Sequence, residues 1–236
     1  MIDDILYLCG GDQPWDSSLW VTSDDRVRGG ASRSHLSVAS PERARFHGRL
    51  DTKALGGAGF ASQHSLGVLS WDLRDYEGVI VAIGGPGRAD GKRYALTLKD
   101  ELPPARGDGR ERAGVSWEAE FVAEKPGDVR LRWEDFKPTY RGRPKEDAAP
   151  LDLGDVKRIG LMMRSFFGQQ EGEFLLELHA IAAWKRLPLS SAATTLCGED
   201  DRDDGEHLKA EELGSENAPL QQTTQSWWRR LLCGML

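Results

Sequence analysis

A dense group of charged residues stands directly before a pair of glycines near the start of the chain. Asp24 and Asp25 are followed by Arg26 and Arg28, and Gly29–Gly30 comes next. Four charges are costly to bury without partners, so they must pair with one another, face solvent or meet a binding partner. Two consecutive glycines permit positive φ angles or a close backbone approach that a side chain would block. The group is therefore either a self-neutralising surface loop or a recognition loop on a β scaffold, and both interpretations stay open.

A second glycine-rich stretch, Ile83–Lys92, resembles a nucleotide-binding loop but lacks the required spacing. If Gly85 and Gly87 opened a dinucleotide fingerprint, its third glycine would fall at Asp90. The residues that follow alternate in polarity like a strand, whereas phosphate binding would need the N-terminus of a helix. We therefore expect a hairpin turn here. The sequence also contains no P-loop, no Gly-x-Ser-x-Gly elbow and no His-Glu-x-x-His motif.

The remaining groups that could perform chemistry are not spaced for it. Glu134 and Asp135 would point to opposite faces of an extended strand, which does not suit an acid/base pair. The acidic run Asp200–Glu206 lacks the alternating ligand spacing of a calcium loop. The five histidines and three cysteines are scattered, without metal-binding spacings: His35, His47, His64, His179, His207, Cys9, Cys197 and Cys233. We predict no enzymatic activity, no metal and no cofactor, and a reducing compartment.

The elements that must position these residues are β-strands. Between residues 15 and 186, short runs alternate with period two and are bounded by Gly, Pro or Asp clusters. The clearest runs are Val79/Val81/Ile83, Tyr94/Leu96/Leu98, Val115/Trp117/Ala119/Phe121, Val129/Leu131/Trp133, Ile159/Leu161/Met163 and Phe174/Leu176/Leu178. About ten such strands predict an all-β sandwich of the jelly-roll type. Asp100–Gly114 and Lys137–Leu153 would be rim loops, where binding usually takes place.

The two ends of the chain differ from this middle part. Residues 1–14 form a lead-in whose acids, Asp3, Asp4 and Asp12, are not typical of an arginine-rich mitochondrial presequence. Residues 187–225 contain too little apolar surface to offset the entropy of ordering, so we expect a disordered acidic linker. The net charge of −7 disfavours a general nucleic-acid binder, which should present a basic face.

The last segment, residues 226–236, has the pattern of a short amphipathic helix. Arg229 and Arg230 would lie on one face, opposite five apolar residues that share the other: Trp227, Trp228, Leu231, Leu232 and Met235. Such a face suits a membrane surface or a docking partner, and S-acylation of Cys233 would strengthen membrane binding. The alternative is that this segment folds back on its own domain.

An ordered series of motifs carries a resemblance to a known family. Trp20 is followed by Ser-Asp-Asp-Arg-Val-Arg-Gly-Gly-x-Ser, ending at Ser32. Further matching stretches, which span roughly Trp15 to Trp184, are Phe46–Leu50, Gly56–Ser62, Trp71–Gly78, Asp90–Tyr94, Trp133–Gly142, Ile159–Met163 and Gly172–Leu178. Together they resemble the complex I intermediate-associated protein 30 family, whose first-described members help to assemble respiratory NADH:ubiquinone oxidoreductase.

The resemblance implies a galactose-binding-like jelly roll and a non-catalytic assembly factor, or chaperone, that binds intermediates of mitochondrial complex I and other assembly factors. On this view two regions are candidate partner contacts. The first comprises Asp24, Asp25, Arg26, Arg28, Gly29 and Gly30, and the second comprises Tyr140, Arg141 and Arg143. Charges would orient docking and exposed aromatic side chains would anchor it.

Two alternatives remain at this point. A cytosolic or membrane-surface member of the family would keep the fold and bind other partners, in keeping with the absence of a visible presequence and with the Trp/Arg/Leu/Cys segment at the end. A carbohydrate- or small-ligand-binding sandwich is suggested by the fold class alone, and fold does not determine function.

Overall fold

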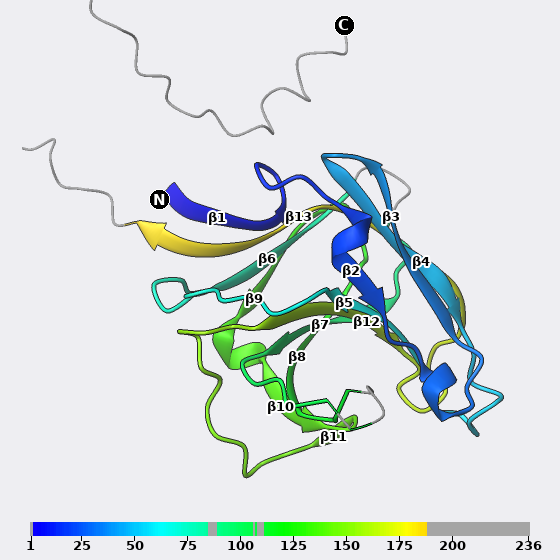
Figure 1. The fold of residues 1–236 in the computed structure, drawn as a ribbon. Helices are drawn as coiled ribbons and strands as arrows, with labels where there is room; N and C mark the ends of the chain where they lie inside the picture. Colours follow the sequence, from blue (N-terminus) through cyan, green and yellow to red (C-terminus); the bar gives the residue numbers. More distant parts are fainter. Residues whose placement is uncertain (1, 85–88, 106, 108–110, 188–236) are drawn as a thin grey trace, which may run out of the picture. The chain divides into compact units, whose positions relative to one another are not determined.

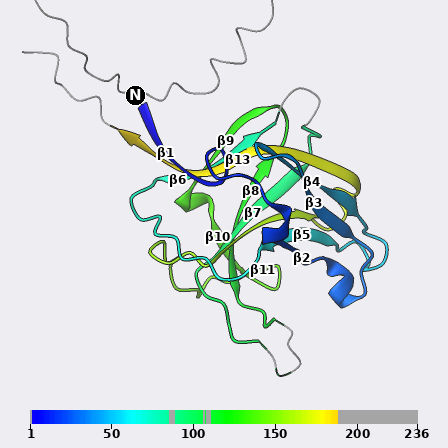
Figure 2. The ribbon, with the colours of Figure 1, turned by 45° about the horizontal axis from the view of Figure 1, so that its top comes forward.

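A computed structural model describes residues 2–84, 89–105, 107 and 111–187 as two packed antiparallel β-sheets (Figures 1 and 2). Its strands, in chain order, are β1 (Ile2–Gly10), β2 (Trp20–Thr22), β3 (Arg33–Ser40), β4 (Arg43–Leu50), β5 (Phe60–Ser65), β6 (Gly78–Ile83), β7 (Arg93–Lys99), β8 (Val115–Val122), β9 (Gly127–Arg132), β10 (Lys137–Tyr140), β11 (Arg143–Pro144), β12 (Arg158–Arg164) and β13 (Gly172–Leu187). Three single-turn 3-10 helices accompany them: η1 (Ser17–Leu19), η2 (Asp25–Arg28) and η3 (Trp133–Asp135). The expected all-β jelly-roll sandwich is confirmed.

Strands that follow one another in the sequence often belong to different sheets. Sheet A has the order β3-β4-β13-β6-β9, with β1 also paired to β13, and sheet B has the order β11-β10-β8-β7-β12-β5-β2. The long strand β13 pairs with β4 through its first half and with β6 and β1 through its second half. Many neighbours in a sheet are therefore distant in sequence, as is usual for a jelly roll.

The core lies between the inner faces of the two sheets and follows the alternation of the sequence. An aromatic cluster spans the interface, with Phe46 on β4 and Phe174 on β13 of sheet A meeting Tyr94 on β7 of sheet B. The Tyr94 hydroxyl donates to Asp90 at 2.7 Å, which satisfies its polar end, and burial raises the pKa of Tyr94. In the strands of sheet B, the apolar residues point into the core and the residues between them project outward. These outward residues form the candidate site.

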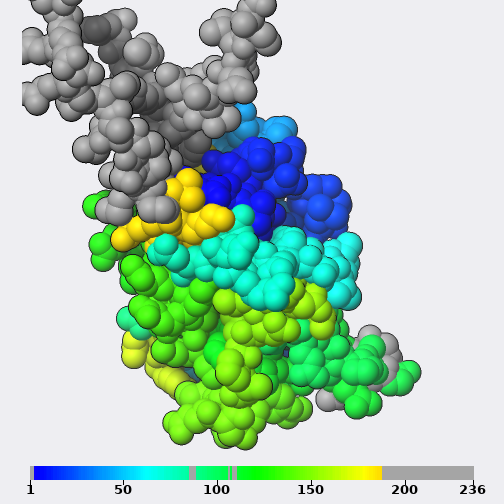
Figure 3. All heavy atoms as spheres, turned by 90° about the vertical axis from the view of Figure 1, so that its left-hand side faces the viewer, coloured from blue at the N-terminus to red at the C-terminus, as the bar shows by residue number. Residues whose placement is uncertain are grey.

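The first strand corrects the expected boundary of the domain. The sequence analysis treats residues 1–14 as a lead-in, but β1 pairs along its length with β13, and Leu8 belongs to the core. The adjacent acids Asp3 and Asp4 obscured this strand in the sequence because they interrupt its apolar pattern, and they pair with Arg130 and Lys185. Figure 3 shows the dark blue N-terminal strand beside the end of β13 (orange).

Two further expectations about connections are wrong. The predicted hairpin turn between residues 83 and 92 does not join paired strands, because β6 belongs to sheet A and β7 to sheet B. Residues 137–153 are not entirely loop, because β10 and β11 form a short hairpin at the edge of sheet B. Glu134 and Asp135 lie in the turn η3, and not in an extended strand.

The side of the sandwich is closed by two long connections that pair with each other. Trp71 and Val156 exchange backbone hydrogen bonds of 3.1 and 2.9 Å, and the Leu73 N–H donates to the Leu153 carbonyl. Figure 3 shows the two segments in contact, in cyan and yellow-green. In the described residues, no helix is long and apolar enough to cross a membrane.

Candidate functional site

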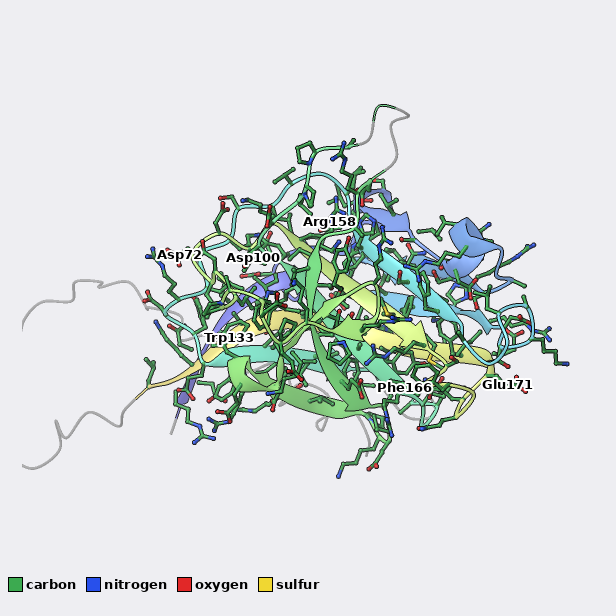
Figure 4. The ribbon with its side chains drawn as sticks, turned by 90° about the horizontal axis from the view of Figure 1, so that it is seen from below. Asp72, Asp100, Trp133, Arg158, Phe166 and Glu171 are labelled. Atoms are coloured by element: carbon green, nitrogen blue, oxygen red, sulfur yellow. The ribbon has the colours of Figure 1, made fainter. Side chains whose placement is uncertain are left out.

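A groove of about 1280 Å³ lies over the outer face of sheet B. Its centre is lined by residues of neighbouring strands, among them Ser62 on β5, Met162 on β12 and Thr97 on β7. Longer charged side chains surround this centre. Figure 4 looks onto this face, with Arg158 and Phe166 labelled toward opposite ends of β12.

The loop formed by Ser23–Ser32, here called the 23–32 loop, is built around two buried carboxylates. Asp24 accepts hydrogen bonds from the Ser34 N–H (3.0 Å), the Ser34 hydroxyl (2.6 Å) and the Ser62 N–H (3.0 Å). Ser34 is on β3 of sheet A and Ser62 is on β5 of sheet B, so this carboxylate joins the two sheets. A buried carboxylate that receives backbone N–H groups is well satisfied without a cation.

Asp25 anchors the end of the same loop. Its carboxylate accepts from the Ser32 N–H (3.0 Å), the Ser32 hydroxyl (2.6 Å) and the Phe60 N–H (3.1 Å). Asp24 is 3% exposed and Asp25 is fully buried. The interpretation of a self-neutralising surface loop is therefore corrected, because both acids are structural groups, and only Asp24 meets an arginine, Arg26 at 3.4 Å. Neither acid offers a surface to a partner.

The glycine pair serves both purposes expected of it. Gly29 has φ +84° and ends η2 in the left-handed conformation. A Cβ atom at Gly30 would lie 2.2 Å from the Asp25 carboxylate, so this glycine lets the backbone approach the buried acid. The glycines shape the loop and leave contact with a partner to other residues.

The exposed residues of the loop are the arginines and the valine between them. Arg26, Val27 and Arg28 all face solvent, and Val27 is 79% exposed. The Arg28 guanidinium lies 5.6 Å from the centroid of the Phe60 ring, at the edge of the groove. Val27 and Arg28 line the groove, whereas Arg26 does not.

The second predicted region forms the turn of the β10–β11 hairpin. Tyr140 pairs with Arg143, and the two residues between them have positive φ, 55° at Arg141 and 75° at Gly142. This is the arrangement of a type I′ turn, which suits a two-residue hairpin. Arg141 and Arg143 are exposed and line the groove, while Tyr140 lies just outside it, 39% exposed, with Arg141 over its ring at 5.4 Å.

The strand register places these two regions at opposite corners of one groove. The 23–32 loop follows β2 and lies beside Phe60, which pairs with Arg164 at the end of β12. Tyr140 pairs with Val115 at the start of β8, the end at which β12 begins with Arg158. A partner that occupied the groove lengthwise would meet both regions.

Ion pairs cover the floor between these corners. Arg164 contacts both Glu118 (2.7 Å) and Glu120, and Glu118 also accepts from Thr139 at 2.6 Å. Arg158 binds both oxygens of Glu111 at 2.8 and 2.9 Å. In the groove as a whole, nine lysines and arginines and five acids give a formal charge of +4, against −7 for the full chain.

Three titratable groups with shifted pKa values lie at the end of the groove near Arg158. Burial and the positive charge of Arg158 lower the pKa of Lys99. Burial lowers the pKa of His64, partly opposed by its hydrogen bond to the Ser65 carbonyl. Hydrogen bonds from Arg158 lower the pKa of Glu111. Positive charge is thus concentrated here in a partly desolvated place.

The opposite end carries an alternation of arginine and phenylalanine. The guanidinium groups of Arg93 and Arg164 both contact the Phe166 ring, 4.6 and 4.7 Å from its centroid. Phe166 and Phe167 both have positive φ, 47° and 59°, which is unfavourable for residues of this size. This backbone presents Phe167 to solvent with 93% of its surface exposed, at the lip of the groove.

Other chemistry-bearing residues do not gather into a site. In the described residues, no group of three or more His, Cys, Asp and Glu side chains could hold a metal ion. His35 and His47 stack at 5.6 Å on sheet A, while His64 lies in the groove. Burial raises the pKa of the Cys9 thiol to about 12. The acidic linker and the segment with Trp227, Trp228, Leu231, Leu232 and Cys233 lie outside the described residues.

The two contact regions predicted from the sequence lie at corners of the groove, whereas the residues of its floor and Phe167 at its lip were not predicted. The floor residues are the polar partners of the alternating core positions, such as Glu118 and Glu120 between Trp117 and Phe121. Such residues look like ordinary solvent-facing positions until the register brings four strands together. Phe166–Phe167 gave a usable signal, because two adjacent aromatic residues between strands are not explained by a core pattern.

Comparison with known proteins yields a family and a fold. The family model described as Complex I intermediate-associated protein 30 matches residues 11–178. An uncharacterized protein of Schizosaccharomyces pombe is 36% identical over 187 residues, which cover 76% of this chain and 84% of that protein.

Two solved structures that are similar to this fold are carbohydrate-binding modules. The family 11 module of the cellulosomal cellulase Lic26A-Cel5E of Clostridium thermocellum superposes with a TM-score of 0.53 at 10% identity, covering 76% of this chain and 94% of the module. A family 11 module from the same organism, in complex with a β-1,3-1,4-mixed-linked tetrasaccharide, also gives 0.53, at 11% identity, with coverages of 75% and 94%. At such identities the likeness establishes the jelly-roll fold.

Proposed function

Because the chain belongs to the Complex I intermediate-associated protein 30 family, we propose that it is a non-catalytic assembly factor that binds an intermediate of mitochondrial respiratory complex I in the groove of sheet B. The family is one of assembly factors and is associated with mitochondria. The observation that carries the proposal is that one groove holds residues of both predicted contact regions, Arg28 at one corner and Arg141 and Arg143 at the other.

The physical character of the groove supports a protein partner. Exposed Phe167 is a candidate anchor, because aromatic residues surrounded by arginines dominate many protein interfaces. The charge of +4 would steer an acidic surface toward the groove and set its orientation. The proposed partner is therefore an assembly intermediate that presents an acidic surface with an apolar recess for Phe167.

Native-gel complexome profiling of the endogenous protein tests this function, with mitochondria and cytosol separated beforehand. Co-migration with subunits of a partial complex I in the mitochondrial fraction is the expected result. A low-mass species confined to the cytosol or to other membranes would contradict the proposal and favour the alternative of a family member that binds other partners.

Charge reversal in the 23–32 loop, where Arg28 lines the groove and Arg26 lies just outside it, tests this corner of the surface. The variant Arg26→Glu/Arg28→Glu should lose most of the co-migration, because two exposed cations become anions facing an acidic partner. The matched control Arg33→Glu/Arg49→Glu changes the same charge on sheet A, away from the groove, and should retain it. Equal behaviour of the two variants, at equal thermal stability, would exclude this surface.

Carbohydrate binding is the second candidate, since a module of the same fold was solved with a tetrasaccharide. The described lining of the groove contains four phenylalanines, with neither tryptophan nor tyrosine among its residues, and ionic side chains cover its floor. This lining fits a charged protein surface better than a neutral sugar chain. A thermal-shift screen with β-glucan oligosaccharides would revive this candidate if it raised the melting temperature.

A further inference from the structure

Two positive side chains face each other on the floor of the groove. Lys99, the last residue of β7, lies directly opposite Arg158, the first residue of β12, in the antiparallel register. Both line the groove, so their side chains project from the same face. Like charges in directly opposed positions destabilise a sheet. The pair therefore has a cost that the fold alone does not explain.

Glu111 and Glu118 both favour the charge of Lys99, but Glu111 forms its hydrogen bonds with Arg158. Glu111 binds both terminal nitrogens of Arg158. Within the part of the chain that the structure describes, the Lys99 ammonium makes neither a hydrogen bond nor an ion pair. Lys99 is half-buried, and burial and the charge of Arg158 both oppose its positive charge. Its ammonium group therefore stays available to an anion, with three N–H donors beside a second positive charge.

The neighbouring residues provide room and a further donor. Thr97 stands two positions before Lys99 on the same face, and it pairs with Gly160 on β12. Gly160 has no side chain, which lets the Thr97 hydroxyl lie against the β12 backbone: a Cβ atom there would be 2.6 Å from Thr97 Oγ1. The Thr97 hydroxyl therefore lines the groove on the same face as Lys99.

We propose that an oxyanion, a carboxylate or a phosphate group, binds at Lys99 beside Arg158, with the Thr97 hydroxyl as an additional donor. Glu111 shows that a carboxylate fits Arg158 in bidentate geometry. The Glu111 side chain is 59% exposed and can move away from Arg158. Its carboxylate therefore competes with an external anion for Arg158, and the bound anion repels or displaces it. The site lies on the floor of the groove in which the proposed partner docks, but binding of a small anion there does not depend on that partner.

Isothermal titration of the full chain with sodium phosphate, and separately with sodium succinate, tests the site at constant ionic strength set with sodium chloride. The variant Lys99→Met should weaken binding by about ten- to a hundredfold, the value of a hydrogen bond to a charged group. It should also fold, because it removes a repulsion between like charges. The matched control Lys137→Met removes a lysine that lines the same groove but donates to the Glu134 carbonyl, and it should bind normally.

Glu111→Gln provides an independent arm. Removal of the competing charge should tighten binding of the anion about three- to tenfold. Saturable binding of phosphate but not of succinate would identify a phosphate-bearing ligand. Saturable binding of succinate but not of phosphate would identify a carboxylate-bearing ligand. Either result supports the site. No saturable binding of either probe, equal weakening by the two lysine variants, or weaker binding by Glu111→Gln would overturn it.

Discussion

The buried carboxylate of Asp24 gives the sharpest prediction about what holds the groove in place. Replacement by asparagine keeps the shape of the side chain but exchanges one acceptor oxygen for an NH₂ donor. Each oxygen of Asp24 receives a backbone N–H, from Ser34 or from Ser62. In either orientation of the amide, one of these buried N–H groups therefore meets a donor.

The expected loss is large for a substitution of one atom. Losing a hydrogen bond to a charged group removes about 1.5–3 kcal/mol, and leaving a buried N–H without an acceptor costs about 1–3 kcal/mol more. We expect Asp24→Asn to lower the free energy of unfolding by about 3–5 kcal/mol. Arg26→Ala should cost at most about 1 kcal/mol, because that guanidinium is 53% exposed and 3.4 Å from the carboxylate.

Urea unfolding followed by tryptophan fluorescence measures both variants on the same scale. Trp15 and Trp20 lie in the region that Asp24 supports, with ring centroids 5.9 Å apart, so they report its loss. Comparable effects of the two substitutions would mean that the aspartate and arginine form one surface pair, as the sequence analysis first allowed. A cost below about 1 kcal/mol for Asp24→Asn would likewise refute the account based on hydrogen bonds.

Three further predictions use the same unfolding measurement. Gly29→Ala should cost about 1 kcal/mol because of its positive φ, and Gly30→Ala distinctly more, because its Cβ would meet the Asp25 carboxylate; the reverse order would contradict this packing. Burial lowers the pKa of His64, so the unfolded state binds more protons than the folded state just below pH 6.5, and the free energy of unfolding should fall as the pH drops through that range. His64→Gln should flatten this pH dependence, and an unchanged slope would contradict the role of His64. Phe167→Gly should raise stability by about 1 kcal/mol through relief of the left-handed backbone while weakening capture of the partner, and a loss of stability would show that Phe167 is packed.

The alternation of the core made the fold predictable from the sequence. Runs such as Tyr94/Leu96/Leu98 identify strands because every second side chain must enter a shared core. The strand β1 is not evident from the sequence because the adjacent acids Asp3 and Asp4 interrupt its apolar pattern, and their partners Arg130 and Lys185 lie far along the chain. The link from β6 to β7 was misjudged since local alternation does not reveal to which sheet a strand belongs.

The site was predictable only where its chemistry is local. The loop with Asp24 could be recognised as special from its charges and glycines, but its inner and outer residues could not be separated. The Asp24 carboxylate faces inward because Ser34 and Ser62, on two later strands, donate hydrogen bonds to it. The opposition of Lys99 and Arg158 depends on a register between residues about sixty positions apart, which no short motif encodes.

The pairing of the first strand with the last has a consequence for how the chain reaches its native state. Ile2 lies opposite Leu187, and β13 also completes the hydrogen bonding of β4 and β6. On a ribosome, sheet A cannot close until nearly the whole domain has emerged, and topologies dominated by such distant pairs fold slowly. Until then β1, β4 and β6 each lack their β13 neighbour, and open strand edges invite pairing with other chains. A nascent or shortened form that ends before β13 should therefore depend on molecular chaperones for its own solubility.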